Sequence, residues 1–532
     1  MVLTVAALAA GASLAMPATA TAAPAATSVP AVSWGACAAA DLTAVPAADK
    51  DKYTCAVYAV PLDYKHPDAG SINLALMRRA ANDQAHRIGS LFLNPGGPGG
   101  SGYKMPISGA ARYFTSEVAD RFDMIGFDPR GVGRSTPLRC FNTQEDYDRV
   151  FAKAASVPVS RQEEKDTLAV YDEYGDFCSR IAGPLKEHMS TADVARDLDR
   201  MRAAVGDTKL NYVGFSYGTL LGATYANMFP NNARAIIIDG NVDPKLRLSD
   251  GLEYDRQRTK GFEFALDALL KRCDAAGAAC AFSGGARAKF DDMRDTLKAK
   301  GPVTLANGTK IGYPELVNTT ASTLYRPAQL ESLTKLFQDV YQAVHPKPAL
   351  AAQALSVQST EDTSALVADA KLNRFDVLPD ALYTADDSYY GVNCSDKPFS
   401  QPASQTPRIA AQWEKQMPTF GRVQAWADPA VCPSWPVDNP VPYEGPWNKK
   451  TTNPVLVVGN YYDPATQYEF AKRMSQELGN ARLLTVDAFG HCILGGSTCA
   501  DKIAARYLVD LALPAPGTVC NANVVPFPAA KP

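Results

Sequence analysis

The chain has 532 residues, and its composition, with 46% hydrophobic and 20% charged residues, is ordinary for a globular protein. Its net charge is −3 and it carries no basic block, which argues against nucleic acid as a partner and against an electrostatic membrane anchor. The length leaves room for more than one domain.

The first residues are typical of an export signal. Residues 2–16 are apolar and rich in alanine, no charged side chain precedes Asp41, and small residues at 18–22 provide Ala-x-Ala cleavage sites. The apolar run is too short for a comfortable membrane span. We therefore expect a secreted protein that is not stably inserted in a membrane once the signal is removed. The basic residue that usually opens a signal peptide is missing, so a disordered leader is the alternative.

The 11 cysteines support export, because they form no Cys-x-x-Cys motif and have no histidines at zinc spacing. In an exported protein they are expected to form disulfides. Nearest-neighbour pairing gives Cys37–Cys55, Cys140–Cys178, Cys273–Cys280 and Cys394–Cys432. Three cysteines near the C-terminus are left over, so one of them is expected to be free, although sequence alone does not fix the connectivity.

Strand and helix patterns alternate along the first half of the chain. Short apolar runs predict strands at residues 56–62, 72–78, 88–93, 122–127, 210–213 and 235–238. Helical patterns follow at 193–205 and 219–228. Apolar strands that alternate with helices indicate an α/β protein, with a mostly parallel sheet flanked by helices.

The pattern becomes mostly helical between about residues 246 and 446, after which strands resume. Helices are predicted there at 261–273, 286–300 and 327–344. Strands return at 455–458 and 483–486, with helices at 467–478 and 501–513. We therefore expect a large helical insertion, called the cap below, before the last strands. The predicted division is a signal peptide at 1–23, core at 24–245, cap at 246–446 and core at 447–532.

The most informative motif is Gly-Phe-Ser-Tyr-Gly at residues 214–218, between a predicted strand and a predicted helix. Gly-x-Ser-x-Gly in this context places the serine on a sharp, strained turn, where larger flanking residues would collide with the strand and the helix. Ser216 is therefore the expected nucleophile. A glycine-rich turn with a solvated serine is the alternative.

A serine hydroxyl is a weak nucleophile and needs an adjacent base. In a strand–turn–helix elbow the chain order is serine, acid, histidine. Of the five histidines, only His345 and His491 follow Ser216. His345 lies inside the helical insertion, whereas His491 follows a predicted strand, so His491 is the expected base.

The acid that orients the histidine should leave a strand end shortly before it. Asp463 does so, a few residues after the strand at 455–458. Asp239, after the strand at 235–238, is the runner-up. Asp463 followed by proline could also be an ordinary turn.

Acyl transfer also requires N–H donors for the developing oxyanion. One is expected from Tyr217, directly after the nucleophile, and the other from the loop after the strand at 88–93. Pro95 and Pro98 have no N–H, which leaves Gly96 or Gly97, and we favour Gly97.

Two further motifs receive no catalytic role. Residues 97–102 match the dinucleotide fingerprint Gly-x-Gly-x-x-Gly, but the loop carries two prolines and no clear helix follows it. Residues 128–131, Asp-Pro-Arg-Gly, predict a buried turn held by an Asp–Arg network.

Together these motifs resemble the α/β-hydrolase fold and, more narrowly, the exported tripeptidyl aminopeptidases of actinobacteria, relatives of the prolyl aminopeptidases. The resemblance spans roughly residues 34–520 and is carried by the Gly/Pro loop at 94–102, by 127–135, by the elbow, and by the regions of Asp463 and His491. It implies a triad of Ser216, Asp463 and His491. It also implies a Cys499–Cys520 disulfide, which leaves Cys492 as the free thiol.

The activity that the resemblance implies is the release of tripeptides, or similar short peptides, from free N-termini through an acyl-enzyme. An acidic cap residue would then read the substrate ammonium, and Asp386, Asp387 and Asp396 are the candidates. Solvated loop acids are the alternative for each of them.

A secreted carboxylesterase with the same triad is the alternative function, because the acyl-enzyme chemistry is shared. A non-catalytic binding protein would be expected to lose part of the triad, and all three residues are present. The expected partners are peptide substrates, with no metal or organic cofactor, and the oligomeric state is left open.

Overall fold

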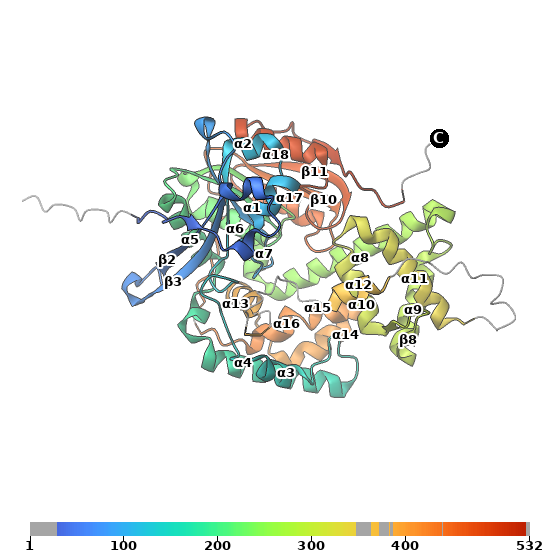
Figure 1. Cartoon of the computed structure of the whole chain (residues 1–532). Helices are drawn as coiled ribbons and strands as arrows, with labels where there is room; N and C mark the ends of the chain where they lie inside the picture. The colour runs from blue at the N-terminus through green and yellow to red at the C-terminus, as the bar shows by residue number, and fades with distance from the viewer. Residues whose placement is uncertain (1–28, 347–362, 372–381, 384–386, 439, 528–532) are drawn as a thin grey trace, which may run out of the picture.

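The computed structural model of the chain describes residues 29–346, 363–371, 382–383, 387–438 and 440–527. A twisted sheet occupies the upper part of the molecule, and the helical cap lies below and beside it (Figure 1). The sheet has ten strands in the order β1-β2-β3-β5-β4-β6-β7-β10-β11-β12. Their bounds are β1 Gly35–Ala36, β2 Tyr53–Pro61, β3 Ser71–Arg79, β4 Gly89–Asn94, β5 Phe122–Phe127, β6 Leu210–Phe215, β7 Ala233–Asp239, β10 Val455–Tyr462, β11 Ala481–Phe489 and β12 Val519–Asn521.

The sheet is parallel from β5 to β12, and only the edge formed by β1, β2 and β3 is antiparallel. The prediction of a mostly parallel sheet is therefore confirmed. Because parallel strands end at the same edge of a sheet, the loops after β4, β6, β10 and β11 open on one side of the molecule. In open α/β sheets, ligands bind at this carboxyl edge.

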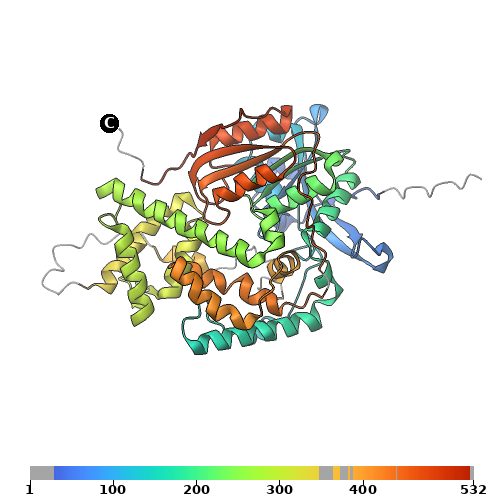
Figure 2. The ribbon, with the colours of Figure 1, turned by 180° about the vertical axis from the view of Figure 1, so that it is seen from behind.

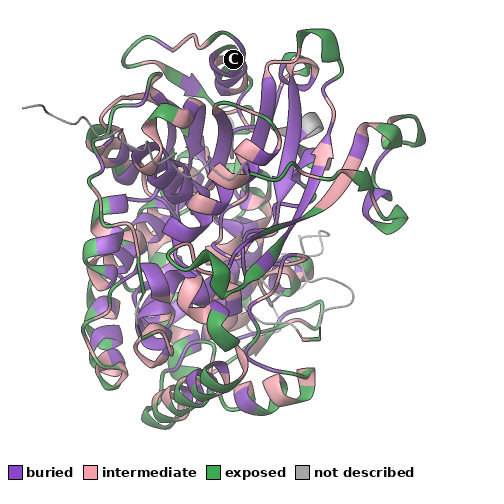
Figure 3. Cartoon of the chain, turned by 90° about the vertical axis from the view of Figure 1, so that its left-hand side faces the viewer, coloured by how far each residue is buried: buried purple, intermediate pink, exposed green. Residues whose placement is uncertain are grey.

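Both faces of the sheet are covered, which explains why its strands are apolar without a polar alternation. Phe92 of β4 packs in one core cluster and Leu91 and Leu93 in the other, since successive side chains point to opposite faces. The central strands are accordingly buried (Figure 3). One cluster includes residues of α5 Thr191–Ala204, α6 Gly218–Met228 and α17 Tyr468–Glu477; the other includes residues of α1 Met105–Arg112, α2 Ser116–Arg121 and α18 Thr498–Asp510.

The cap is inserted between β7 and β10 and has a core of its own, formed mainly by helices α8 to α11. Seen from behind, α8 (light green) runs between the red C-terminal part of the sheet and the orange cap helices (Figure 2). The cap elements are α7 Pro244–Ser249, α8 Gly251–Ala276, α9 Ala286–Lys300, β8 Val303–Thr304, β9 Lys310–Ile311, α10 Tyr313–Thr323, α11 Leu330–Val344, α12 Ser364–Lys371, α13 Asp387–Asp396, α14 Thr406–Gln416, α15 Gly421–Ala425 and α16 Asp428–Val431.

The structure differs from the predicted division at residues 144–181, which belong to the crossover between β5 and β6. This segment forms α3 Gln144–Phe151 and α4 Arg161–Ile181, and both lie beneath the cap helices (Figure 1). The Tyr171 hydroxyl of α4 donates to the Trp426 carbonyl. A Cβ at Gly175 would lie 2.1 Å from the Ser434 carbonyl oxygen, so a glycine is needed where α4 meets the cap. Part of the predicted core therefore packs on the cap.

Five disulfides cross-link the chain: Cys37–Cys55, Cys140–Cys178, Cys273–Cys280, Cys394–Cys432 and Cys499–Cys520. Cys492 is the remaining free cysteine. All the predicted pairs are present. Within the described ranges, none of the helices has both the length and the apolar character to span a bilayer.

Candidate active site

Ser216 occupies the turn between β6 and α6, and its backbone is strained. Its φ of 55° lies in the left-handed region that a residue with a Cβ rarely adopts. The surrounding structure holds this conformation, since the Ser216 N–H donates to the Asp239 carbonyl at 2.9 Å. The Thr219 N–H and hydroxyl both donate to the Ser216 carbonyl, at 2.8 Å and 2.6 Å. This is the geometry of a nucleophile elbow.

Two glycines make room for this turn. A Cβ on Gly214 would lie 2.3 Å from the Gly218 carbonyl oxygen. A Cβ on Gly96, in the loop after β4, would lie 2.2 Å from the Phe215 carbonyl oxygen and 2.9 Å from the Ser216 Cβ. The backbone of the Gly/Pro loop can therefore approach the elbow only because residue 96 has no side chain.

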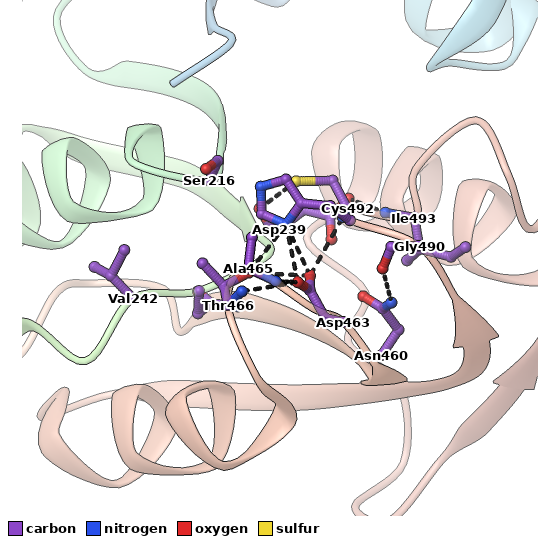
Figure 4. A network of polar contacts seen from close by, with 12 residues as sticks. Ser216, Asp239, Val242, Asn460, Asp463, Ala465, Thr466, Gly490, Cys492 and Ile493 are labelled. Carbon is purple, nitrogen blue, oxygen red and sulfur yellow. Dashed lines mark hydrogen bonds and ion pairs between the residues drawn. The ribbon is translucent and has the colours of Figure 1, made fainter. Parts of the chain in front are cut away.

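Asp463 and His491 meet at the carboxyl ends of β10 and β11. The His491 Nδ1 lies 3.0 Å from each carboxylate oxygen of Asp463, whose side chain is 1% exposed. The N–H groups of Ala465 and Thr466 donate to Asp463 Oδ1 at 2.9 and 2.8 Å, and the Thr466 hydroxyl donates to Oδ2 at 3.0 Å (Figure 4). The Cys492 N–H also donates to Oδ2, at 3.4 Å, so five groups fix the carboxylate, which is what an orienting acid requires.

The cap contacts the predicted base directly. The backbone N–H of His491 donates to the backbone carbonyl of Tyr325, between α10 and α11, at 3.1 Å. The Tyr325 ring stands edge-on to the imidazole with a centroid distance of 4.9 Å. From the sheet side, Asn460 donates to the Gly490 carbonyl at 2.7 Å (Figure 4). The position of the histidine therefore depends on both parts of the fold, and sequence reasoning missed Tyr325 and Thr466, which no motif marks.

A cavity of about 600 Å³ lies between the sheet and the cap, and its lining includes Ser216, His491, Tyr217 and Gly97. The Gly96 N–H is already bonded to the Asn94 side chain at 2.9 Å. Within the described residues, the N–H groups of Gly97 and Tyr217 have no acceptor. These two amides can therefore serve as oxyanion donors, and Gly96 cannot.

Asp239, the runner-up acid, has a different environment. It is fully buried and accepts from the N–H groups of Ile493 and Leu494, each at 2.8 Å. Burial raises the pKa of Asp239 to about 7, against the lowering effect of these two donors. Its hydrogen bonds shape the loop after His491 and do not reach the imidazole.

Cys492 follows the histidine with a φ of 61° and donates its thiol to the Asp239 carbonyl at 3.3 Å. Burial raises the pKa of this thiol well above its usual value. In the part of the chain that the structure describes, no cluster of three His, Cys, Asp or Glu side chains could hold a metal ion.

The carboxylates predicted to read the substrate ammonium do not line the cavity, and this prediction is corrected for the two that can be placed. Asp387 accepts from the Tyr174 and Tyr383 hydroxyls and from the Cys140 N–H. Asp396 accepts from the N–H and hydroxyl of Thr191, at 3.0 and 2.5 Å. Both are buried, as are most residues of α13. Asp386 lies outside the described residues.

Two other carboxylates line the cavity instead, those of Asp369 on α12 and Asp428 on α16. Neither carboxylate belongs to a motif, so sequence reasoning did not find them. The Asp-Pro-Arg-Gly turn is structural, as predicted: Arg130 is buried and forms an ion pair with Asp197 at 2.7 Å.

Comparison with known proteins finds relatives over most of the chain. Residues 89–269 match the family described as alpha/beta hydrolase fold, and residues 416–520 match the one described as TAP-like protein. Serine protease Hip1 of Mycobacterium tuberculosis is 30% identical over 486 residues, which cover 88% of this chain and 87% of that protein. Tripeptidyl aminopeptidase of Streptomyces coelicolor is 31% identical over 484 residues, which cover 89% and 84%. Carboxylesterase B of Mycobacterium tuberculosis is 30% identical over 479 residues, which cover 88% and 86%.

These relatives agree with the fold and confirm the family that the motifs suggest. The chain belongs to the α/β-hydrolase family of serine hydrolases that contains the tripeptidyl aminopeptidases.

Proposed function

We propose that the chain is a secreted serine exopeptidase that releases tripeptides, or similarly short peptides, from free N-termini. The observation that carries the proposal is that the strained Ser216 and the His491–Asp463 pair meet in one cavity, which is lined by residues of both the sheet and the cap. The names of the peptidase relatives support a peptide substrate. The five disulfides and the apolar leader support secretion.

In the proposed mechanism the Ser216 oxygen attacks the carbonyl carbon of the scissile bond while His491 takes the hydroxyl proton. The N–H groups of Gly97 and Tyr217 stabilise the oxyanion, and Asp463 stabilises the imidazolium. The C–N bond breaks as His491 gives the proton to the leaving amine. Water then attacks the acyl ester, again with His491 as base, and releases the short peptide.

We propose that the Asp369 carboxylate binds the N-terminal ammonium group of the substrate. Among the described residues its ion-pair partner is Arg326, at 2.9 Å, and the two side chains are 39% and 51% exposed. An exposed ion pair of this kind contributes only about 0–1 kcal/mol, so a substrate ammonium can replace Arg326 at little cost. Asp428 is a poorer candidate, because Lys397 already contacts its carboxylate in a buried site.

The test compares three substrates: a tripeptidyl p-nitroanilide, its N-acetylated form and a p-nitrophenyl acyl ester. We expect the free-amine peptide to be cleaved and the acetylated peptide to be poor. Asp369→Asn should raise KM for the free amine with little effect on the acetylated form. Turnover of the ester alone would instead indicate a carboxylesterase with the same triad, the function of one relative.

A further inference from the structure

Three arginines line the cavity in addition to the proposed catalytic residues: Arg326, which pairs with Asp369, and the two arginines Arg247 and Arg258. Arg247 belongs to α7 and Arg258 to α8, and both helices lie where the cap joins the sheet. Across the residues that the structure describes, no carboxylate lies within ion-pair distance of either guanidinium. The guanidinium N–H donors of these two cavity-lining residues are therefore not bonded to any described carboxylate.

The hydrogen bonds of the two guanidinium groups go to neutral acceptors. Arg247 is 5% exposed, donates to the Asn393 side-chain oxygen, and keeps its buried Nε without an acceptor. Arg258 donates to the side-chain oxygen of Gln424 at 3.2 Å. Both acceptors are neutral amides, which orient a guanidinium without compensating its charge.

The acids of this region, Asp255, Asp396 and Asp428, stabilise the two guanidinium charges through space, but their direct contacts go to other groups. The Lys397 Nζ lies 3.0 and 2.8 Å from the two oxygens of Asp255 and also contacts Asp428. Asp396 accepts from Thr191. Lys397 thus forms direct ion pairs with two carboxylates, whereas Arg247 and Arg258 form none with the described carboxylates.

The guanidinium of Arg247 lies close to the nucleophile elbow. Its guanidinium carbon lies 6.0 Å from the ring centroid of Tyr217, the residue whose N–H is a proposed oxyanion donor, and 5.2 Å from the ring centroid of Tyr254. The Tyr217 hydroxyl is itself fixed by the Thr191 hydroxyl at 2.5 Å. The guanidinium therefore stands next to the elbow, within reach of the part of the substrate that becomes the acyl group.

We propose that Arg247 and Arg258 form a subsite for a carboxylate side chain, an Asp or Glu, in the short peptide that is released. Guanidinium groups bind carboxylates through paired N–H donors, and the interaction strengthens where water is excluded. A bound acidic side chain supplies the direct ion pair that no described carboxylate forms with the two arginines. The subsite rests on the proposed exopeptidase function and specifies its substrate class.

The test uses tripeptidyl p-nitroanilides built on Ala-Ala-Ala, with Glu or Gln placed in turn at each of the three positions. Glu and Gln differ in charge and hardly in shape, so their ratio of kcat/KM isolates the carboxylate. We expect Glu to be preferred at least tenfold at one position. Arg247→Gln and Arg258→Gln should each bring that ratio towards one, and Arg258→Lys should restore part of it.

Arg256→Gln is the matched control. Arg256 lies on the same helix as Arg258, but it pairs with Glu253 at 2.6 Å and is not among the residues that line the cavity. This variant should keep the wild-type ratio, and labelling by a fluorophosphonate should show that every variant retains a folded site.

Equal cleavage of the Glu and Gln substrates at all three positions, with Ala-Ala-Ala cleaved, would overturn the subsite and leave the exopeptidase. A preference that survives both arginine substitutions would also overturn it. If Ala-Ala-Ala itself is not cleaved while an ester is, the proposed function fails and the subsite fails with it.

Discussion

Both carboxylate oxygens of Asp463 lie 3.0 Å from Nδ1 of His491, so the acid holds the ring in one orientation and one tautomer. Asp463→Asn would present an amide that no longer selects this tautomer. We predict that kcat falls by about 10³–10⁴, as expected for the orienting acid of such a triad, with little change in KM. Steady-state kinetics on the tripeptidyl anilide would measure it.

Asp239→Asn is the control for that prediction, because Asp239 does not contact the imidazole. It should reduce kcat far less than Asp463→Asn. The reverse order of effects would assign the acid role to Asp239.

Gly96→Ala tests the approach of the Gly/Pro loop to the elbow. The new Cβ would collide with the Phe215 carbonyl oxygen at 2.2 Å. Gly206→Ala is the control, because Gly206 also has a positive φ, of 84°, but its Cβ would meet nothing within 4 Å. We predict that Gly206→Ala lowers the free energy of unfolding by about 1–2 kcal/mol, through strain alone. Gly96→Ala should lower it further and also slow fluorophosphonate labelling, and equal effects of the two substitutions would contradict the account.

Asp239 should make stability depend on pH. Its pKa is about 7 in the folded protein and 3.8 in an ordinary setting, because burial disfavours the charged form. Between these values the folded chain holds a proton that the unfolded chain has lost, so the free energy of unfolding falls as pH rises. The contribution is fully present below pH 3.8 and is lost as pH passes 7.

Asp239→Asn removes this dependence, since an amide does not ionise. Relative to the wild type, the variant should gain about 3 kcal/mol of unfolding free energy between pH 5 and pH 8. Denaturant unfolding with the disulfides intact would measure both proteins. If the difference in unfolding free energy between the two proteins stays constant from pH 5 to pH 8, Asp239 does not titrate in that range.

Cys492 should behave as a single, poorly reactive thiol. With 11 cysteines and five disulfides, one thiol remains, and burial raises its pKa, so little thiolate is present at neutral pH. We predict that a disulfide-exchange reagent titrates one thiol per chain in denaturant and reacts with the native protein at least about 100-fold more slowly. Rapid reaction of the native protein, or a second thiol in denaturant, would contradict this.

The proposed catalytic residues could be picked out from the sequence because each carries a local signature. The two glycines of the elbow motif identified Ser216. Asp463 and His491 were identified because each follows a predicted strand and because the expected chain order is serine, acid, histidine. Strands of the core were equally visible, since a sheet covered on both faces needs continuous apolar runs. The closing helix was predicted at 501–513 but begins at Thr498, where the Ser497 side chain caps it.

The substrate side of the site was not predictable. Asp369, Arg247 and Arg258 reach the cavity only through the way the cap helices dock, and docking leaves no spacing in the sequence. The same docking turned Asp387 and Asp396 toward the core, although their position near Cys394 suggested the site. The contribution of α4 to the cap also depends on a contact between segments more than 200 residues apart.

The most direct test of the central claim is mass spectrometry of a ten-residue peptide with a free N-terminus, incubated with the wild type and with Ser216→Ala. The account predicts successive release of N-terminal tripeptides by the wild type, none by the variant, and none from the N-acetylated peptide. Cleavage at internal bonds, or release that persists without the Ser216 hydroxyl, would contradict it.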